Sequence, residues 1–151
     1  MIGKLADTEI EELLKENIWG HLGCNDGFNT YIYPTNYFYD GRFIMCHSQN
    51  GSKIQIMQHN SRVCFQVEEV EDHKSWKSVM VRGDFQELTD DRERYAAVKA
   101  FGDRRMYIKT SDTALLYDPT GIAEDTGTLK KFSPVIYRIV IDEKTGRFED
   151  G

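Results

Sequence analysis

The sequence predicts a mainly β fold, an antiparallel barrel of six strands with helices at its periphery. Stretches in which apolar and polar residues alternate recur along the chain, and turn signals such as Asp26-Gly27 and Asp40-Gly41 separate them. The last stretch is the apolar segment VIYRIVI, which suits a strand that closes the sheet and leaves no edge exposed. At 151 residues the chain has the length of one domain, so residues 1–151 are expected to form a single unit.

The first part of the chain is expected to hold a helix followed by three strands. Thr8 and Glu11 form a capping-box pattern, which predicts a short amphipathic helix over residues 8–16. Strands are then predicted at 18–24, 28–39 and 43–47. The second of these strands is crowded with aromatic residues, namely Tyr31, Tyr33, Tyr37, Phe38 and Tyr39. One face does not need so many rings, so some are expected to cover a ligand or a partner subunit.

The hydrophobic period changes from two to that of a helix at Gly51. Ser52 stands at the expected N-cap, and Gln55 three residues later completes a capping-box pattern. This places Lys53 in the first helical turn, where the helix dipole disfavours a cation by about 0.3–1 kcal/mol. A bound anion would compensate for that cost.

Two further strands, a helix and a closing strand are predicted in the second half of the chain. Strands are expected at 61–68 and 76–88, with Gly83 marking a bulge or a close backbone approach. Asp90 with Glu93 opens a helix. Residues 103–132 are interpreted as a long irregular excursion, and the closing strand at 133–142 is followed by a Lys-Thr-Gly turn.

Composition excludes several classes of function. The net charge of −6 argues against a general nucleic-acid binder, because neutralising phosphates requires a basic surface. The sequence contains no run of 18 apolar residues, so no membrane span is predicted. The three cysteines form no C-x-x-C pair and are interpreted as reduced thiols of a cytoplasmic protein. His21, His59 and His73 share no metal-ligand spacing, so no metal site is expected.

Two interpretations of the turn around Lys53 are open on these residues alone. Free backbone N–H groups, the Ser52 hydroxyl and the Lys53 ammonium would converge on one point, which is what a phosphate monoester needs. An ordinary capped helix with a solvated lysine explains the same residues. Gly-Ser-Lys is too short a motif to decide between them.

The order of motifs over residues 5–105 resembles the pyridoxamine 5′-phosphate oxidase-like split-barrel flavoproteins. The segments that carry the resemblance are HLGCNDG, YIYPTNYFYDGRFIMCHSQNGSK, NSRVCFQVEE and SWKSVMVRGDFQEL. The HS…G-K segment and the later W-x-S-V-x-V-x-G are most similar to the 5-nitroimidazole-resistance (Nim-type) branch. This resemblance favours the phosphate interpretation of Lys53 and implies a homodimer with FMN at its interface.

The resemblance implies FMN contacts at Tyr33, Pro34, Thr35, Asn36, Cys46, His47, Ser48, Ser52, Lys53, Trp76 and Ser78. Ser52 stands where the oxidase itself commonly has an arginine, so less charge would hold the phosphate, and oxidation of pyridoxamine phosphate is not expected. His47 is the candidate catalytic proton donor, or else a hydrogen-bonded residue at a strand end. Trp76 lies either near the flavin, at the dimer contact or in the core. Cys46 is interpreted as a packing residue on the opposite face from His47.

The function expected from this resemblance is that of an FMN-dependent oxidoreductase that passes electrons to a small acceptor such as a nitroaromatic or a quinone. A non-catalytic protein that carries a flavin or haem on the same barrel is the alternative. A dimeric scaffold whose site has lapsed is a third.

Overall fold

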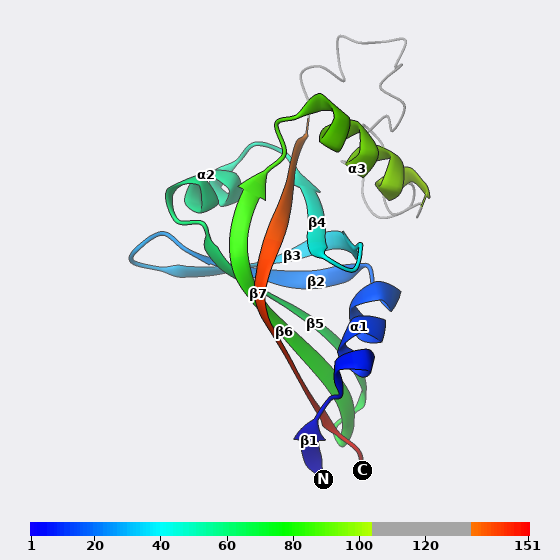
Figure 1. The fold of residues 1–151 in the computed structure, drawn as a ribbon. Coiled ribbons are helices and arrows are strands. Elements are labelled where there is room, and N and C mark those ends of the chain that lie inside the picture. Colours follow the sequence, from blue (N-terminus) through cyan, green and yellow to red (C-terminus); the bar gives the residue numbers. More distant parts are fainter. Residues whose placement is uncertain (104–133) are drawn as a thin grey trace.

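The computed structural model describes residues 1–103 and 134–151. Three helices and seven strands are described, in an order that begins with a short strand and ends with a long one (Figure 1). Along the chain they are β1 (Ile2–Lys4), α1 (Asp7–Glu16), β2 (Trp19–Asn25), β3 (Thr30–Tyr39), β4 (Phe43–Ser48), α2 (Ser52–His59), β5 (Arg62–Asp72), β6 (Ser75–Glu87), α3 (Asp91–Asp103) and β7 (Val135–Glu149). Apart from Asp103, which ends α3, the expected excursion over 103–132 lies outside the described residues.

The strands form one antiparallel sheet that closes on itself. Its order is β1-β7-β4-β3-β2-β5-β6, and β6 pairs in turn with β7. Strands β2 to β7 therefore make the closed six-stranded barrel that the sequence predicts. The three-residue strand β1, which the sequence did not predict, adds to the outer part of β7 through pairs such as Ile2 with Glu149.

The barrel interior is an apolar core made by alternate residues of all six strands. Its largest fully buried side chains include Tyr37, Phe65 and Tyr137. The Tyr37 hydroxyl donates a hydrogen bond of 2.8 Å to the carbonyl of Leu14, which attaches α1 to the barrel. The buried side chains of Leu13 and Leu14 complete this contact.

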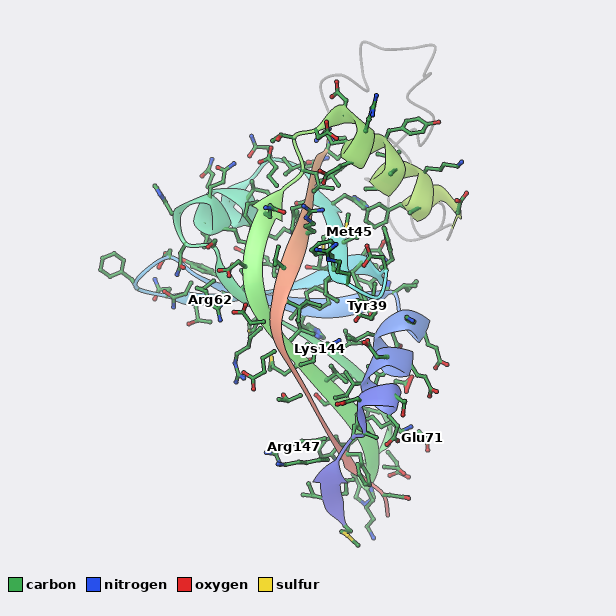
Figure 2. The ribbon with its side chains drawn as sticks, viewed as in Figure 1. Tyr39, Met45, Arg62, Glu71, Lys144 and Arg147 are labelled. Atoms are coloured by element: carbon green, nitrogen blue, oxygen red, sulfur yellow. The ribbon has the colours of Figure 1, made fainter. Side chains whose placement is uncertain are left out.

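A charged contact also attaches α1 to the barrel. Lys144 on β7 donates from Nζ to Glu11 Oε1 at 2.9 Å and to the Tyr39 hydroxyl at 3.1 Å (Figure 2). The neighbouring charges and hydrogen bonds outweigh burial and lower the pKa of Glu11, so this carboxylate stays ionised. The contact joins three elements that are far apart in the sequence.

A second, smaller core lies on the outer side of the barrel, under α3. It consists of Phe38, Met45, Leu88, Ala97, Phe101 and Ile136. Asp90 caps α3, because its carboxylate accepts a hydrogen bond of 3.2 Å from the Glu93 backbone N–H, and this confirms the predicted helix start. Helix α3 thus covers one end of the barrel, on the side of β4 and β7 (Figure 1).

Two predicted helix caps are wrong by one or two residues. Helix α1 starts at Asp7 with Ala6 as its N-cap, and Glu9 rather than Glu11 accepts a hydrogen bond from the backbone N–H of Ala6. Helix α2 has Gly51 as its N-cap, with no side chain capping it, and Ser52 is the first helical residue. A capping motif in a sequence does not fix where the backbone leaves its extended conformation.

The C-terminal strand is longer than predicted. The expected turn at Lys144-Thr145-Gly146 lies inside β7, where these residues pair with Val81, Met80 and Val79 of β6. Pairing with β6 holds this segment extended, and β1 pairs with the three residues of β7 that follow it. The predicted irregularity at Gly83 is confirmed by a register shift between Arg82 and Gly83.

None of the helices in the described ranges has the length and apolar character needed to cross a membrane. In the same ranges, no three His, Cys, Asp or Glu side chains gather as metal ligands would.

Candidate functional site

The candidate site is built on the turn between β4 and α2. Strand β4 ends at Ser48, and the extended backbone of Gly51 leads directly into the helix. The first hydrogen bond of the helix runs from the Gln55 N–H to the Gly51 carbonyl at 3.1 Å. The N–H groups of the residues between them have no acceptor within the helix and point out of its N-terminus.

The first turn of α2 differs in charge from those of the other two described helices. Helix α1 has Asp7 and Glu9 in its first turn, and α3 has Asp91 and Glu93. These carboxylates compensate the positive end of the helix dipole. Helix α2 has no acidic residue there and has Lys53 instead. Its N-terminus is therefore the one among the described helices that carries uncompensated positive charge.

The Lys53 side chain is partly buried and lies over an aromatic ring. Its Nζ is 5.5 Å from the centroid of the Tyr33 ring. Burial lowers the pKa of Lys53, while the nearby thiols of Cys46 and Cys24 act in the opposite direction. In the part of the chain that the structure describes, no carboxylate forms an ion pair with Lys53. A partly buried ammonium in this position favours an anion as its partner.

Behind Lys53, the barrel interior is lined by weakly polar groups. Cys46 on β4 lies opposite Tyr137 on β7, and both side chains are fully buried. Burial raises the pKa of Cys46 to about 12 and that of Tyr137 well above its ordinary value, so both groups keep their protons at neutral pH. The expected packing role of Cys46 agrees with this burial, because a buried thiol with a raised pKa is not a nucleophile.

His47 points away from the barrel interior and lies under α3. Its ring packs edge-on against Phe101, with centroids 4.7 Å apart and an interplanar angle of 87°. Cys46 belongs to the interior core instead, so the two side chains lie on opposite faces of β4, as predicted. Burial first, and the charge of Lys53 second, lower the pKa of His47 to about 4. The imidazole is therefore neutral at pH 7, and its catalytic role stays a prediction.

The Tyr33-to-Asn36 segment divides its side chains between two faces of β3. Thr35 is buried and donates a hydrogen bond of 3.1 Å to the Tyr33 carbonyl. Asn36 donates a hydrogen bond of 2.9 Å to the carbonyl of Ile18, the residue just before β2. Pro34 is exposed and lies opposite His21. Of these four residues, Tyr33 is the one whose side chain contacts Lys53.

Trp76 and Ser78 do not join the other predicted site residues within one chain. Trp76 donates from Nε1 to Glu149 at 2.9 Å, and the Ser78 hydroxyl accepts a hydrogen bond of 2.9 Å from Gln66. Both residues lie near the start of β6, beside the chain termini and at the opposite end of the sheet from α2 (Figure 1). Their predicted cofactor contact would require a second copy of the chain.

The structure thus gathers Tyr33, Cys46 and Lys53, with His47, Ser48 and Ser52 nearby in the same turn or strand end. Sequence reasoning missed Cys24, whose thiol lies near Lys53, and Tyr137, which lies in the interior beside Cys46. The alternation along β2 and β7 places both side chains inward. These side chains lie at the same end of the barrel as Lys53 because β4 pairs with β7. The order of the strands along the chain does not by itself predict that pairing.

Comparison with known proteins agrees with the fold and the motif order. The family model described as pyridoxamine 5′-phosphate oxidase matches residues 6–148. An uncharacterized protein of Rhizobium meliloti is 39% identical over 84 residues, which are 56% of each chain, so the match spans little more than half the length of that relative.

Solved structures resemble the chain over almost its whole length. A FAD-binding protein of Mesorhizobium loti is 26% identical, with 99% of each chain covered and a TM-score of 0.74. A candidate 5-nitroimidazole antibiotic resistance protein of Bacteroides thetaiotaomicron is 21% identical, with 98% of this chain and 87% of the other covered and a TM-score of 0.72. A FAD-binding protein of Mycobacterium smegmatis is 20% identical, with 99% of this chain and 100% of the other covered and a TM-score of 0.65.

Proposed function

Because the chain belongs to the pyridoxamine 5′-phosphate oxidase family, we propose that it is a flavoprotein that binds the phosphate of FMN at the N-terminus of α2. The observation that carries this proposal is Lys53, a partly buried cation in the first turn of a helix that has no acidic residue there. The resemblance to FAD-binding proteins of Mesorhizobium loti and Mycobacterium smegmatis supports a flavin as the ligand.

The groups around the turn fit a phosphate monoester. Lys53 supplies a positive charge, the exposed Ser52 supplies a hydroxyl, and the first-turn N–H groups of α2 supply further donors. The ring of Tyr33, next to Lys53, presents an apolar surface to the rest of the ligand. His47 and Cys46 add no charge, because the imidazole is neutral and the thiol keeps its proton at pH 7.

The proposed activity is that of an oxidoreductase. A bound flavin supplies reversible electron and hydride transfer, and the chain binds and orients it. The donor, a reduced nicotinamide or a reductase, is oxidised, and a small acceptor such as a nitroaromatic or a quinone is reduced by the same number of electrons. The alternative, a carrier of flavin or haem, uses the same site and differs only in the absence of turnover.

A homodimer would complete the site in this proposal. Exposed apolar side chains lie on the outward face of the barrel: Trp19, Ile32 and Val70 are 46%, 69% and 62% exposed. Val70 is the cross-strand partner of Trp76, so one of these exposed side chains lies beside a predicted cofactor contact. Covering these residues with a second copy would bury them and bring Trp76 and Ser78 toward the partner's α2.

The test is a titration of the flavin-free protein with FMN, for the wild type, Lys53→Ala and the control Lys99→Ala, which changes an exposed lysine on α3. We expect yellow protein on purification and FMN affinity weakened by about 1–3 kcal/mol in Lys53→Ala, roughly 5- to 150-fold, through loss of a charge-assisted contact. Lys99→Ala should bind as the wild type does. Protein that binds no FMN contradicts the proposal, and flavin that NAD(P)H or a reductase cannot reduce under anaerobic conditions favours the carrier.

A further inference from the structure

A groove runs along α2 on the side that faces the tip of the β2–β3 hairpin. Its volume is about 460 Å³, which lies in the range of small-molecule sites. Asp26 and Tyr31 line it from the hairpin, and Ser52, Gln55, Ile56, Gln58 and His59 line it from the helix. None of these residues except Ser52 has a role in the flavin site proposed above.

The groove begins at the proposed phosphate position. Ser52, Gln55, Ile56 and His59 follow the i, i+3, i+4, i+7 spacing that places side chains on one face of a helix. From Ser52 to His59 this face is about 10 Å long, at a rise of 1.5 Å per residue. A ligand that is held by its phosphate at Ser52 and continues beyond that phosphate therefore enters the groove.

The groove walls combine a flat apolar surface with acceptors for hydroxyl groups. The Tyr31 ring is nearly parallel to that of Tyr33, at an interplanar angle of 13° with centroids 6.3 Å apart, and its hydroxyl donates to Asp26 Oδ2 at 3.0 Å. These contacts hold the Tyr31 ring in place, with Ile56 on the opposite wall. Rings held in this way suit the stacking of a nucleobase.

Asp26 sets the charge of the groove. Hydrogen bonds from the backbone N–H groups of Asn29 and Phe28 lower the pKa of Asp26, so its carboxylate is ionised at neutral pH. An ionised carboxylate accepts hydrogen bonds from the hydroxyl groups of a sugar and repels a further phosphate. The groove therefore suits an uncharged nucleoside attached to a phosphate at its Ser52 end, rather than a second anionic group along its length.

Resting on the proposed flavin function, we propose that this groove binds the adenosine part of FAD, with the FMN half at Tyr33 and Lys53 and the linking phosphates at the N-terminus of α2. The protein is then an FAD protein that also accepts FMN, and FMN leaves the groove empty. Tyr31 and Ile56 flank the adenine, and Asp26 accepts from the ribose.

The test measures the affinities of FAD and FMN for the flavin-free protein by quenching of flavin fluorescence. The wild type should bind FAD at least tenfold more tightly than FMN. Gln55→Trp, which fills the groove from an exposed helix position, should weaken FAD binding about tenfold and change FMN binding less than twofold. His59→Ala opens the far end of the groove and should weaken FAD alone. Glu12→Trp, a substitution of equal size at an exposed position on α1, should change neither affinity.

Three results overturn this assignment. One is FAD that binds no more tightly than FMN to the wild type, and another is Gln55→Trp weakening both flavins equally. In both cases FMN still binds, so the proposed flavin site stands while the adenosine groove does not. If neither flavin binds the wild type, the proposed function itself fails and the groove assignment fails with it.

Discussion

The Nζ of Lys53 lies 5.5 Å from the centroid of the Tyr33 ring, so the lysine of the α2 turn is folded against the barrel rather than extended into water. Burial lowers its pKa, which means that the folded protein without ligand holds this charge less readily than the unfolded chain does. We therefore expect the lysine to destabilise the turn in the absence of ligand, and a bound anion to relieve this cost. Stability and ligand binding are therefore expected to change in opposite directions at this residue.

Lys53→Met should stabilise the flavin-free protein and weaken flavin binding. Replacing a partly buried ammonium by an apolar side chain of similar length removes the cost of desolvating it, for an expected gain of about 0.5–2 kcal/mol in the free energy of unfolding. Urea unfolding of the flavin-free wild type and variant measures this gain. Lys99→Met, at an exposed position on α3, should change neither stability nor affinity. A Lys53→Met variant that loses stability would mean that the lysine stabilises the turn by itself.

Gly51→Asp tests the corrected position of the α2 cap. No side chain caps this helix, and a Cβ at Gly51 would meet nothing within 4 Å. An aspartate there should cap the first turn and stabilise the flavin-free protein by about 0.5–1 kcal/mol, because it also compensates the helix dipole. Its charge would occupy the place proposed for the phosphate, so FMN affinity should fall. Gly51→Asn, which caps without a charge, should stabilise the helix and lower the affinity less.

Gly83→Ala should destabilise the barrel. Its backbone lies so close to β7 that an added Cβ would overlap the Val140 carbonyl and contact Ile139 at 3.0 Å. Backbone atoms on a closed barrel cannot move aside easily, so the loss should reach about 2–4 kcal/mol. The control is Gly51→Ala, which meets open space and should cost about 1 kcal/mol or less through the weaker N-cap. Equal losses for the two variants, measured by urea unfolding, would contradict the close approach at Gly83.

The order of strands and helices could be predicted because alternation, turn residues and the caps near Asp90 are local features of the sequence. The end of β7 could not be predicted, because Lys144-Thr145-Gly146 has the composition of a turn. What keeps it extended is pairing with β6, to which it is adjacent only in the closed barrel. The short strand β1 was missed for the same reason, because its three residues are strand only by pairing with β7.

The candidate site was predictable in part. Lys53 stands out because a cation in the first turn of a helix opposes the dipole, and that is visible in the sequence. Its inward orientation depends on Tyr33, Cys24 and Cys46, which three different strands bring to one end of the barrel. The groove along α2 could not be predicted from the sequence either, because Asp26 and Tyr31 lie beside the helix only through the shape of the β2–β3 hairpin.

His47 is expected to make the protein sensitive to acid. Its pKa is about 4 in the folded protein and 6.5 in an unfolded chain, so between these values the unfolded chain binds more protons and stability falls as the pH falls. The full loss below pH 4 is about 3 kcal/mol at most, from 1.36 kcal/mol per unit of pKa. The physical cause is the position of the ring against Phe101, beneath α3 and near Lys53, where a second positive charge is unfavourable.

The measurement is the free energy of unfolding in urea for the wild type and His47→Gln at pH 7 and pH 4.5. His47→Gln should be less stable at pH 7, through lost packing against Phe101, but should lose about 2 kcal/mol less than the wild type on acidification. The control His21→Gln changes an exposed histidine and should follow the wild type at both pH values. If His47→Gln and the wild type lose the same stability, acid acts through other groups, and the imidazole is not held neutral by its burial.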